Sequence, residues 1–278
     1  MSDEIPEIPA SRTSHTDNPF SAVILAGARE EQDELRAQEK EDLKAFIKVG
    51  GTPMIDYVLK AVLRSGSIDD IYICMNEGMD FADKAPLLAQ CVKDNKVKIV
   101  PAKDGPSASV TQALSNINDN KKVVITTADH PLLTRAILKE FLQKSSRSGS
   151  DATLGIIPTD IIEHAYPNTK RTRLKFREGG YTGCNLFTLL TPKARQLPEF
   201  WEDLEAMRKK PLNLAGFLGP ITLTQYLTGL LSLDGALEKI SRKTGISMKT
   251  VRMHQPEAGI DVDTPEDLSL VKEIIQNY

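Results

Sequence analysis

The fold is indicated by the stretch Val-Ile-Leu-Ala-Gly-Ala-Arg at residues 23–29, where a β-branched, apolar run leads directly into a turn of small residues. A second stretch, Thr-Thr-Ala-Asp-His-Pro-Leu at residues 126–132, follows an apolar run in the same way. A third, Gly-Ile-Asp-Val-Asp-Thr-Pro, occupies residues 259–265. In an α/β protein such junctions bring ligand-binding groups to the carboxyl edge of a parallel sheet. We therefore expect the three stretches to meet in space.

From Ser21 onward, apolar segments alternate with amphipathic ones, which is typical of successive βαβ units. The expected strands cover residues 22–26, 71–75, 97–100, 123–127, 172–177 and 186–190, with a short strand near Val251. Helices are expected from residue 54, across 110–117, at 199–208, 221–230 and 233–243, and after Thr264. Thr52 and Thr264 are the expected N-caps of two helices, each followed by proline. Asp267, three residues after Thr264, completes a capping signature there. We expect one domain at residues 20–278 and a flexible tail at 1–19, which has few large apolar side chains.

Composition and charge exclude several classes of protein. The 278 residues, of which 40% are hydrophobic, are enough for one large α/β core. The formal net charge is −3 and the sequence pI is about 5.9, so the overall charge does not favour a nucleic acid as partner. The sequence has no apolar stretch of the roughly 20 residues that span a bilayer, and its three cysteines lack CxxC spacing. The expectation is a cytoplasmic protein with neither a nucleic acid nor a membrane as partner.

The turn after the first expected strand is suited to phosphate, because the small residues Ala26, Gly27 and Ala28 let backbone N–H groups approach phosphate oxygens. Arg29 adds a delocalised positive charge. The alternative is a tight turn that binds no ligand. Lys44, in an apolar segment that ends in a glycine pair, is a further candidate for binding phosphate, the alternative being a solvated lysine.

Two aspartates are candidates for binding a metal ion. Asp129 lies two residues beyond a β-branched strand, where its carboxylate projects from the sheet edge; alternatively, it stabilises a turn. Asp263 precedes a helix, and alternatively it serves only the first-turn N–H groups or the helix dipole. Two carboxylates that converge from distant segments suit Mg²⁺. This ion usually binds one or two protein carboxylates and completes its coordination with water and substrate phosphates. Together with the phosphate-binding turn, they indicate a site for a metal-bound nucleotide.

Four motifs in this order resemble a known family. They are Leu-Ala-Gly-Ala at residues 25–28, Lys-Ala at 44–45 with Val-Gly-Gly-Thr-Pro-Met at 49–54, Asp-His-Pro-Leu at 129–132, and Asp-Thr-Pro-Glu-Asp-Leu at 263–268. They resemble the MobA-like nucleotidyltransferases, typified by molybdenum-cofactor guanylyltransferase and by sugar-phosphate nucleotidyltransferases. The resemblance covers Ser21 to the C-terminus. It implies a three-layer α/β/α, Rossmann-like fold of the GT-A type with a mixed, mostly parallel central sheet.

The resemblance also implies which residues form the site. The nucleotide would contact Leu25, Ala26, Gly27, Ala28, Arg29 and Lys44, together with Gly105 and Ser109 in a segment that resembles the family's nucleobase-contacting segment. Lys44 and Asp129 would be catalytic, and Asp129 and Asp263 would hold Mg²⁺, with Mn²⁺ as an alternative. The loop at residues 29–36 departs from the family, because it is longer, acidic and free of glycine.

The reaction implied is transfer of a nucleoside monophosphate from a nucleoside triphosphate (NTP) to a phosphorylated small molecule, such as a sugar, polyol or cofactor phosphate, with release of pyrophosphate. An acceptor phosphate is already anionic, so the reaction needs charge neutralisation and alignment more than a general base. We therefore expect His130 to support Asp129 and not to act as an acid or base. The expected partners are the NTP and the acceptor, and a homodimer is left open.

Residues for the acceptor are expected in the middle of the chain. Arg173 and Lys175, with Arg177, fall on one face of the expected strand at 172–177 and are candidates for binding the acceptor phosphate. The alternative is an exposed strand whose charges prevent edge pairing. Tyr181, Thr182 and Asn185 are candidates for hydrogen bonds to acceptor hydroxyls, the alternative being a turn stabilised by the asparagine itself.

Two other classes of function remain open at the level of sequence. A sugar-transferring enzyme would share the fold, and Asp-Val-Asp at residues 261–263 looks like its Asp-x-Asp signature, although it comes late in the chain and leaves Lys44 without a purpose. Release of pyrophosphate separates the two reactions. The other class is a non-catalytic nucleotide-binding protein. Mg²⁺-dependent binding of a triphosphate without formation of any product would favour this class.

Overall fold

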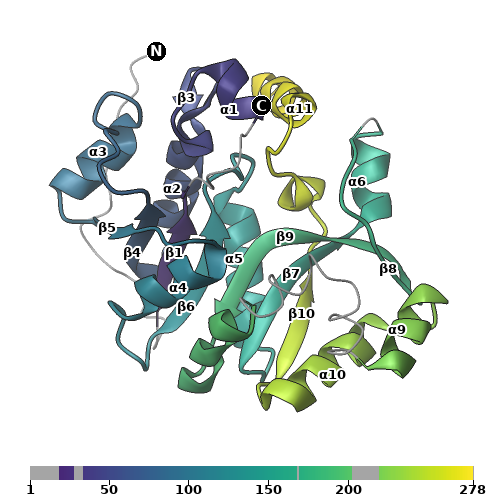
Figure 1. The fold of residues 1–278 in the computed structure, drawn as a ribbon. Coiled ribbons are helices and arrows are strands. Elements are labelled where there is room, and N and C mark those ends of the chain that lie inside the picture. The colour runs from purple at the N-terminus through teal and green to yellow at the C-terminus, as the bar shows by residue number, and fades with distance from the viewer. Residues whose placement is uncertain (1–18, 28–33, 168, 202–218, 278) are drawn as a thin grey trace.

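A mixed sheet of eight strands forms the centre of the protein, seen in a computed structural model that describes residues 19–27, 34–167, 169–201 and 219–277 (Figure 1). The strand order is β10-β7-β9-β6-β1-β4-β5, and β8 pairs with β9. The strands of this sheet are β1 (Phe20–Leu25), β4 (Ile68–Met75), β5 (Val97–Pro101), β6 (Lys122–Thr127), β7 (Ala152–Pro158), β8 (Leu174–Phe176), β9 (Gly179–Leu189) and β10 (Met248–Arg252). The pairs β1–β4, β1–β6, β4–β5 and β7–β10 are parallel, whereas β9 is antiparallel to β6, β7 and β8.

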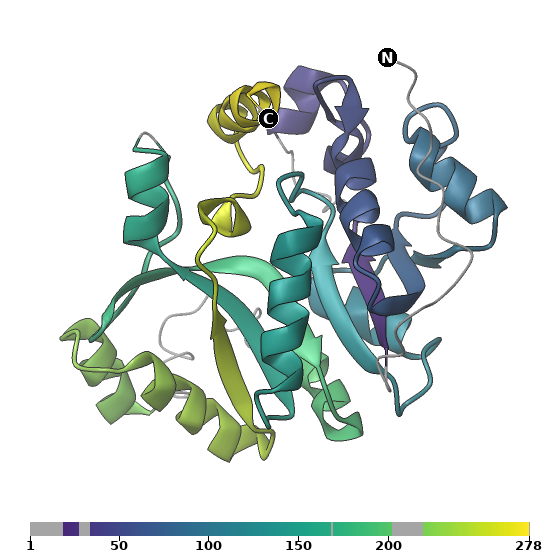
Figure 2. The same ribbon diagram turned by 180° about the vertical axis from the view of Figure 1, so that it is seen from behind.

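Helices cover both faces of the sheet. They are α1 (Glu34–Glu39), α2 (Met54–Arg64), α3 (Pro86–Lys93), α4 (Pro106–Leu114), α5 (Arg135–Ser146), α6 (Thr159–Ala165), α9 (Pro220–Leu227), α10 (Leu233–Thr244) and α11 (Pro265–Gln276), with the 3-10 helices η1 (Lys44–Phe46), η2 (Pro192–Gln196) and η3 (Pro256–Gly259). Figure 1 shows α4 in front of the sheet, and Figure 2 shows α2 and α5 in front of the opposite face. The predicted α/β fold with a mixed, mostly parallel sheet is confirmed.

Strand β1 lies inside the sheet, and its sequence explains why. The side chains of Ala22 and Ile24 belong to the buried cluster under α2, α3 and α5, whereas Val23 belongs to the cluster under α4. A strand that is buried on both faces needs an apolar run rather than alternation of apolar and polar residues. The β-branched residues that follow Ser21 meet this need, and they place the end of the strand at a defined edge of the sheet.

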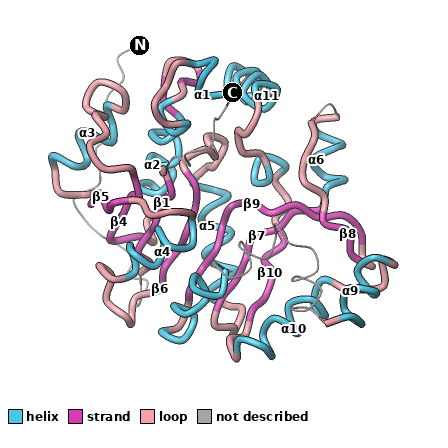
Figure 3. The backbone as a smooth tube through the Cα atoms, in the orientation of Figure 1, coloured by secondary structure: helices cyan, strands magenta, loops and turns pink. Residues whose placement is uncertain are grey.

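The antiparallel strand β9 differs from the sequence-based prediction. A turn was expected near residues 181–185 before a strand at 186–190, but a single strand runs from Gly179 to Leu189. It pairs with β7 on both sides of a register shift between Leu154 and Ile156, and Asn185 adopts a φ of 50°. This left-handed residue bends the strand without ending it. Figure 3 shows β9 crossing the sheet toward β8.

Helix starts were predicted with mixed success. Thr52 is not an N-cap: Thr52 and Pro53 form the short strand β3, which pairs with β2 (Lys48–Val49), and α2 begins at Met54. The prediction at Thr264 is confirmed, because its side chain accepts a hydrogen bond from the Asp267 N–H in a capping box. The expected helix at 199–208 extends mostly beyond the described residues, as does the tail expected at 1–19.

The remaining predicted strands and helices occur within a few residues of their expected ends, and α3, α5, α6, β2 and β7 were not predicted. Across the part of the chain that the structure describes, every helix is too short or too polar to cross a membrane.

Candidate active site

The first two sequence stretches meet at the carboxyl edge of the sheet. Leu25 at the end of β1 is paired with Thr127 at the end of β6, and the next residue, Ala128, donates its N–H to the Leu25 carbonyl at 2.9 Å. Ala26 in turn donates to the Cys74 carbonyl at the end of β4, at 2.8 Å. The small-residue turn and Asp129 therefore lie beside each other, as the parallel register requires.

The third stretch joins the same edge through the backbone. The Val262 N–H donates to the Asp129 carbonyl at 2.9 Å, which places the loop that carries Asp261 and Asp263 directly against the loop after β6. The expectation that all three stretches meet is confirmed.

Lys44 lies between the two predicted metal ligands. Its Nζ is 3.2 Å from Oδ2 of Asp129 and 2.6 Å from Oδ1 of Asp263. The 3-10 helix η1 holds it there, since its neighbours Ala45 and Phe46 are buried in the core. Burial acts to lower the pKa of Lys44, but the two carboxylates outweigh it and raise this pKa above its ordinary value of 10.5. The ammonium group is therefore protonated across the physiological range.

Negative charge is concentrated around this lysine. Asp261 lies close enough to Asp129 and Asp263 to interact electrostatically with both carboxylates. Burial, reinforced by these charges and opposed by Arg171 and Asn185, raises the pKa of Asp261 from 3.8 to about 6. In addition, the buried Oδ1 of Asp129 has no hydrogen-bond partner among the described residues. A carboxylate oxygen left without a donor beside other carboxylates is suited to a cation.

Two side chains hold the Asp261 carboxylate, and His130, the neighbour of Asp129, contacts the backbone of η3. Arg171 donates to Oδ1 of Asp261 at 2.6 Å, and Asn185 donates from Nδ2 to Oδ2 of the same residue at 2.7 Å. His130 is fully buried and its Nε2 lies 3.1 Å from the Glu257 carbonyl in η3. Burial lowers the pKa of His130, so the ring is neutral and Nε2 is the donor. The ring therefore contacts η3, and the support of Asp129 by His130 stays a prediction.

Arg171 was not predicted from the sequence. It stands in a basic run, where nothing distinguishes it from Arg173 two positions later. The one feature of the sequence that could have indicated its role was its partner Asp267, and we interpreted Asp267 only as part of a capping signature. A residue that binds two carboxylates some 90 positions away in the chain is found only when the chain is folded.

The predicted nucleotide-binding residues line the neighbouring part of the edge. A Cβ atom on Gly27 would lie 2.9 Å from the Cβ of Ala102, so only glycine fits there. Gly105, with a φ of 104°, is the N-cap residue of α4. The Ser109 hydroxyl donates to the Gly105 carbonyl at 2.8 Å and accepts the Lys103 N–H at 2.9 Å. Ser109 thus shapes the loop at residues 103–105. Ala28 and Arg29 lie outside the described residues.

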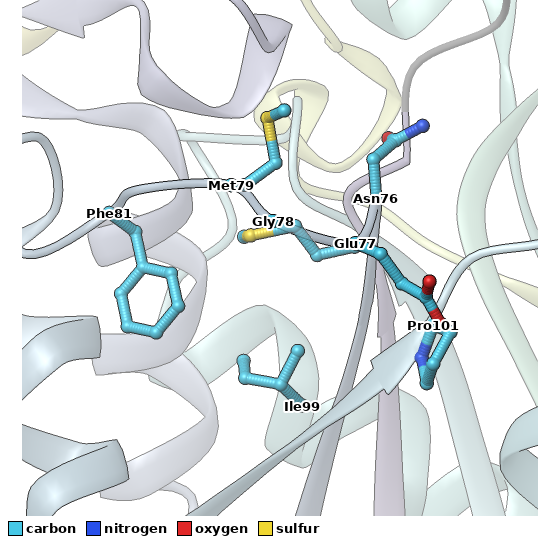
Figure 4. A pocket seen from close by; sticks show the side chains of 8 residues that line it. Asn76, Glu77, Gly78, Met79, Phe81, Ile99 and Pro101 are labelled. Carbon is cyan, nitrogen blue, oxygen red and sulfur yellow. The ribbon is translucent and has the colours of Figure 1, made fainter.

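A pocket of about 390 Å³ opens at the ends of β4 and β5 (Figure 4). Asn76 connects it with the turn after β1, because its Oδ1 is 3.7 Å from the point where a Gly27 Cβ would be. The lining residues are Met75, Asn76, Glu77, Gly78, Met79, Phe81, Ile99 and Pro101.

The predicted acceptor residues are divided between two environments. Asn185 lies at the carboxylates, as described above. Tyr181 and Thr182 are only 4% and 6% exposed, and Tyr181 packs with Ile156 and Leu233 beneath α10. The Arg173 guanidinium is half exposed and lies 3.5 Å from Glu163, and Lys175 is exposed on β8. The structure therefore brings Lys44, Asp129, Asp263 and Asn185 together, and it buries Tyr181 and Thr182 in the protein.

Comparisons with known proteins agree with this arrangement. Residues 22–167, slightly more than half of the chain, match the model of the MobA-like NTP transferase domain. A 2-C-methyl-D-erythritol 4-phosphate cytidylyltransferase of Clostridium tetani is 26% identical over 190 residues, which cover 66% of this chain and 70% of that protein. The enzyme of the same name from Thermotoga neapolitana is 31% identical over 144 residues, or 51% of this chain and 60% of that protein.

Solved structures have the same fold. A hypothetical transferase of Thermus thermophilus superposes with a TM-score of 0.74 at 28% identity, covering 90% of this chain and 99% of that one. A CMP:2-keto-3-deoxy-manno-octonic acid synthetase complexed with CTP gives a TM-score of 0.56 at 14% identity, covering 94% and 99%, which shows likeness of fold. The family model spans the turn after β1, Lys44 and Asp129, and thus includes two of the three stretches that meet at this edge. The chain belongs to the MobA-like NTP transferase family and is a nucleotidyltransferase.

Proposed function

We propose that this protein uses Mg²⁺ to transfer a nucleoside monophosphate from an NTP to a phosphorylated small molecule, with release of pyrophosphate. The observation that carries the proposal is the contact of one ammonium group, Lys44 Nζ, with both Asp129 and Asp263 at the carboxyl edge of the sheet. These residues come from three distant parts of the chain. Their convergence supports a site in which charges are arranged around an anionic substrate.

The donor atoms present fit a hard divalent cation. Asp129 has a buried Oδ1 without a partner among the described residues, and the Asp263 side chain is 62% exposed, so both offer carboxylate oxygens. Asp129 and Asp263 would hold Mg²⁺, with water and phosphate oxygens completing its coordination. When bound, Mg²⁺ would supply positive charge that offsets the repulsion between the phosphates of donor and acceptor.

The chain's own groups account for binding and alignment. In the reaction, an oxygen of the acceptor phosphate forms a bond to the α-phosphorus while the bond from that phosphorus to the bridging oxygen of pyrophosphate breaks. Lys44 provides a permanent positive charge beside the reacting phosphates, and Gly27 and its neighbours leave room for backbone N–H groups to bind them. No side chain has to accept a proton, because the acceptor phosphate attacks as an anion.

The relatives support the acceptor class. Those from Clostridium tetani and Thermotoga neapolitana are cytidylyltransferases of a phosphorylated polyol. We therefore propose a sugar, polyol or related phosphate as acceptor and take CTP as the first triphosphate to test. Arg173 and Lys175 remain our candidates for the acceptor phosphate, and Asn185, already at the carboxylates, our candidate for an acceptor hydroxyl.

The test is an assay of pyrophosphate release from each of the four NTPs with a panel of sugar, polyol and cofactor phosphates. We expect activity that requires Mg²⁺ or Mn²⁺, and we expect Asp129→Ala to lower the rate by about a hundredfold or more without unfolding the protein. Asp119→Ala is the control, because this exposed carboxylate precedes β6 at the opposite end of the strand.

Three outcomes would argue against the proposal. Equal inactivity of the wild type and of Asp129→Ala across the whole panel, with metal-dependent binding of a triphosphate, would favour a non-catalytic nucleotide-binding protein. Transfer of a sugar without pyrophosphate release would favour a glycosyltransferase. Full activity of Asp129→Ala would exclude the assigned metal ligand.

A further inference from the structure

A nearly buried arginine stands behind the candidate metal ligands, four residues past the end of the segment matched by the family model. Only 8% of the Arg171 side chain is exposed, and it forms ion pairs with two carboxylates, Asp261 and Asp267. Nothing in the proposed chemistry uses it, since its donors are directed at the protein itself. Such a residue acts on the site through the groups it holds.

The guanidinium makes contacts of well-defined geometry. Nη1 donates to Oδ1 of Asp261 at 2.6 Å and to the Asp261 carbonyl at 3.0 Å, and Nη2 donates to Oδ1 of Asp267 at 2.6 Å. Nε donates to the Thr169 hydroxyl at 3.3 Å. The fork of a planar guanidinium matches such an arrangement, and a lysine ammonium has no equivalent of it. Arg171 therefore fixes both the backbone and the side chain of Asp261.

The same contacts extend to Asp263. The second oxygen of Asp267, Oδ2, accepts the N–H of Asp263 at 3.1 Å and the N–H of Thr264 at 3.0 Å. Between the two ends, the Val262 N–H is bonded to the Asp129 carbonyl. The loop that presents the Asp263 carboxylate is consequently held at Asp261 by Arg171, at Val262 by Asp129, and at Asp263 by a carboxylate that Arg171 orients.

We propose that Arg171 is a positioning residue that sets the Asp263 carboxylate against Asp129 for a divalent cation. This inference rests on the proposed function, because it concerns the geometry of the proposed metal ligands. Supporting contacts behind metal ligands commonly determine affinity, and their loss typically costs 10- to 100-fold in metal affinity or activity. Arg171 also brings one positive charge close to Asp261, which is repelled by the charges of Asp129 and Asp263.

The protein contains a matched control for a purely structural role. Arg195 is 11% exposed, close to the value for Arg171, and it donates to backbone carbonyls at and beyond the end of α4, including those of Leu114 and Ile117. Replacing either arginine by methionine removes a nearly buried guanidinium of the same size. Both changes can therefore lower stability, but only the change at Arg171 acts on the loop that carries Asp263.

The experiment measures Mn²⁺ binding to the nucleotide-free protein by electron paramagnetic resonance, in wild type, Arg171→Met, Arg171→Lys and Arg195→Met. Unfolding of each variant in EDTA is recorded by circular dichroism to establish that it is folded. We expect Arg171→Met to raise the Mn²⁺ dissociation constant by about tenfold or more, Arg171→Lys to be intermediate, and Arg195→Met to bind as the wild type does. Should Arg171→Met fail to fold, the Arg171→Lys protein carries the same test.

A second measurement follows pyrophosphate release as a function of Mg²⁺ concentration. A positioning role predicts a higher half-saturating Mg²⁺ concentration with much of kcat recovered at saturation, whereas loss of folded protein would lower kcat alone. Unchanged Mn²⁺ binding by folded Arg171 variants would overturn the inference while leaving the proposed function intact, as would equal losses in Arg171→Met and Arg195→Met. A wild-type protein that neither binds Mn²⁺ nor releases pyrophosphate would overturn both.

Discussion

At the scale of single residues, Lys44 is paired with both of the proposed metal ligands. Its ammonium contacts Oδ2 of Asp129 and Oδ1 of Asp263, the two residues proposed to hold the metal. A divalent cation must therefore compete with Lys44 for these groups. We expect Lys44 to have opposite effects on metal binding and on catalysis. It weakens binding of the metal in the absence of nucleotide, and it favours transfer once a triphosphate is bound.

We predict that Lys44→Met binds Mn²⁺ about three- to tenfold more tightly than the wild type in the absence of nucleotide, because a competing ion pair is lost. The same variant should lose about a hundredfold or more in pyrophosphate release, because a charge beside the phosphates is missing. Titration with Mn²⁺ and a steady-state assay measure the two effects. Lys48→Met is the control, since Lys48 is an exposed residue of β2. Weaker Mn²⁺ binding by Lys44→Met would contradict the prediction.

Asp261 makes the stability of the metal-free protein depend on pH. Its pKa is raised to about 6 in the folded state, against 3.8 for the free side chain, so the folded protein binds a proton more tightly than the unfolded chain. This contribution to stability is fully present below pH 3.8 and is lost as the pH rises through 6. One pKa unit corresponds to about 1.4 kcal/mol, so the whole effect is at most about 3 kcal/mol.

We predict that the free energy of unfolding of the wild type, measured with urea in EDTA, increases relative to that of Asp261→Asn when the pH falls from 7.5 to 5. The variant lacks the titrating group and provides the reference at each pH. A difference that stays constant, or that changes in the opposite direction, would show that Asp261 is not held in a protonation-favouring environment.

At the scale of elements, most strands and several helices followed from local patterns. The apolar run of β1 and the capping box of α11 are properties of neighbouring residues, and both were predicted. Strand β9 was not predicted over its full length, because its first half is polar and contains glycines, and it is a strand through its pairing with β7 and β8. Thr52, followed by proline, likewise has the sequence pattern of an N-cap, but in the structure it belongs to β3 and pairs with β2.

Helix α3 begins with a cap that comes from another helix. Both oxygens of Asp56 in α2 accept backbone N–H groups of α3, those of Leu87 and Leu88, each at 3.1 Å. The N-cap residue of α3 itself, Ala85, has no side chain that can do this. Asp56 is 4% exposed, so its removal leaves two N–H groups without a partner in a buried place.

We predict that Asp56→Ala lowers the free energy of unfolding by about 1–2 kcal/mol, the usual cost of losing a helix cap. Asp56→Asn keeps one acceptor oxygen and should lose less. Urea unfolding followed by circular dichroism measures both variants. Equal stability of the wild type and Asp56→Ala would mean that α3 does not depend on this cap.

At the scale of the whole molecule, packing determines the chemistry of the cysteines. Cys74, Cys91 and Cys184 are free and buried on different strands and helices. Burial raises the pKa of Cys74 to about 12, and burial also raises the pKa of Cys91 and of Cys184 above the ordinary range for thiols. Since the thiolate is the reactive form, all three should be inert in the folded protein.

We predict that the native protein reacts with a thiol reagent at pH 8 far more slowly than the unfolded protein, in which all three thiols become reactive. The rate is measured by the absorbance of the released chromophore, with and without urea. Rapid reaction of one thiol in the native state would show that the corresponding part of the core opens readily.

The folded molecule also decides which of the candidate residues share a site. Lys44, Asp129 and Asp263 were selected from separate motifs. The turn after β1 and Asp129 meet because parallel strands end at one edge, a general rule for such sheets, whereas Lys44 on η1 and Asp263 after η3 reach that edge through packing of their segments. The packing of Tyr181 under α10 and the contacts of Arg171 obey no such rule. They depend on how β9 and the chain before it bend, which no short pattern encodes.

The amino-acid sequence was sufficient to predict the α/β architecture, the order of its motifs and the family, because apolar runs, turns and caps are formed by residues that are neighbours in the chain. Long-range contacts alone established the environment of each charge: the pairing of Lys44 with two aspartates, the raised pKa of Asp261 and the buried position of Arg171. The physical reason is that burial and electrostatic interaction depend on distance in space, and that distance is set when separate segments pack against each other.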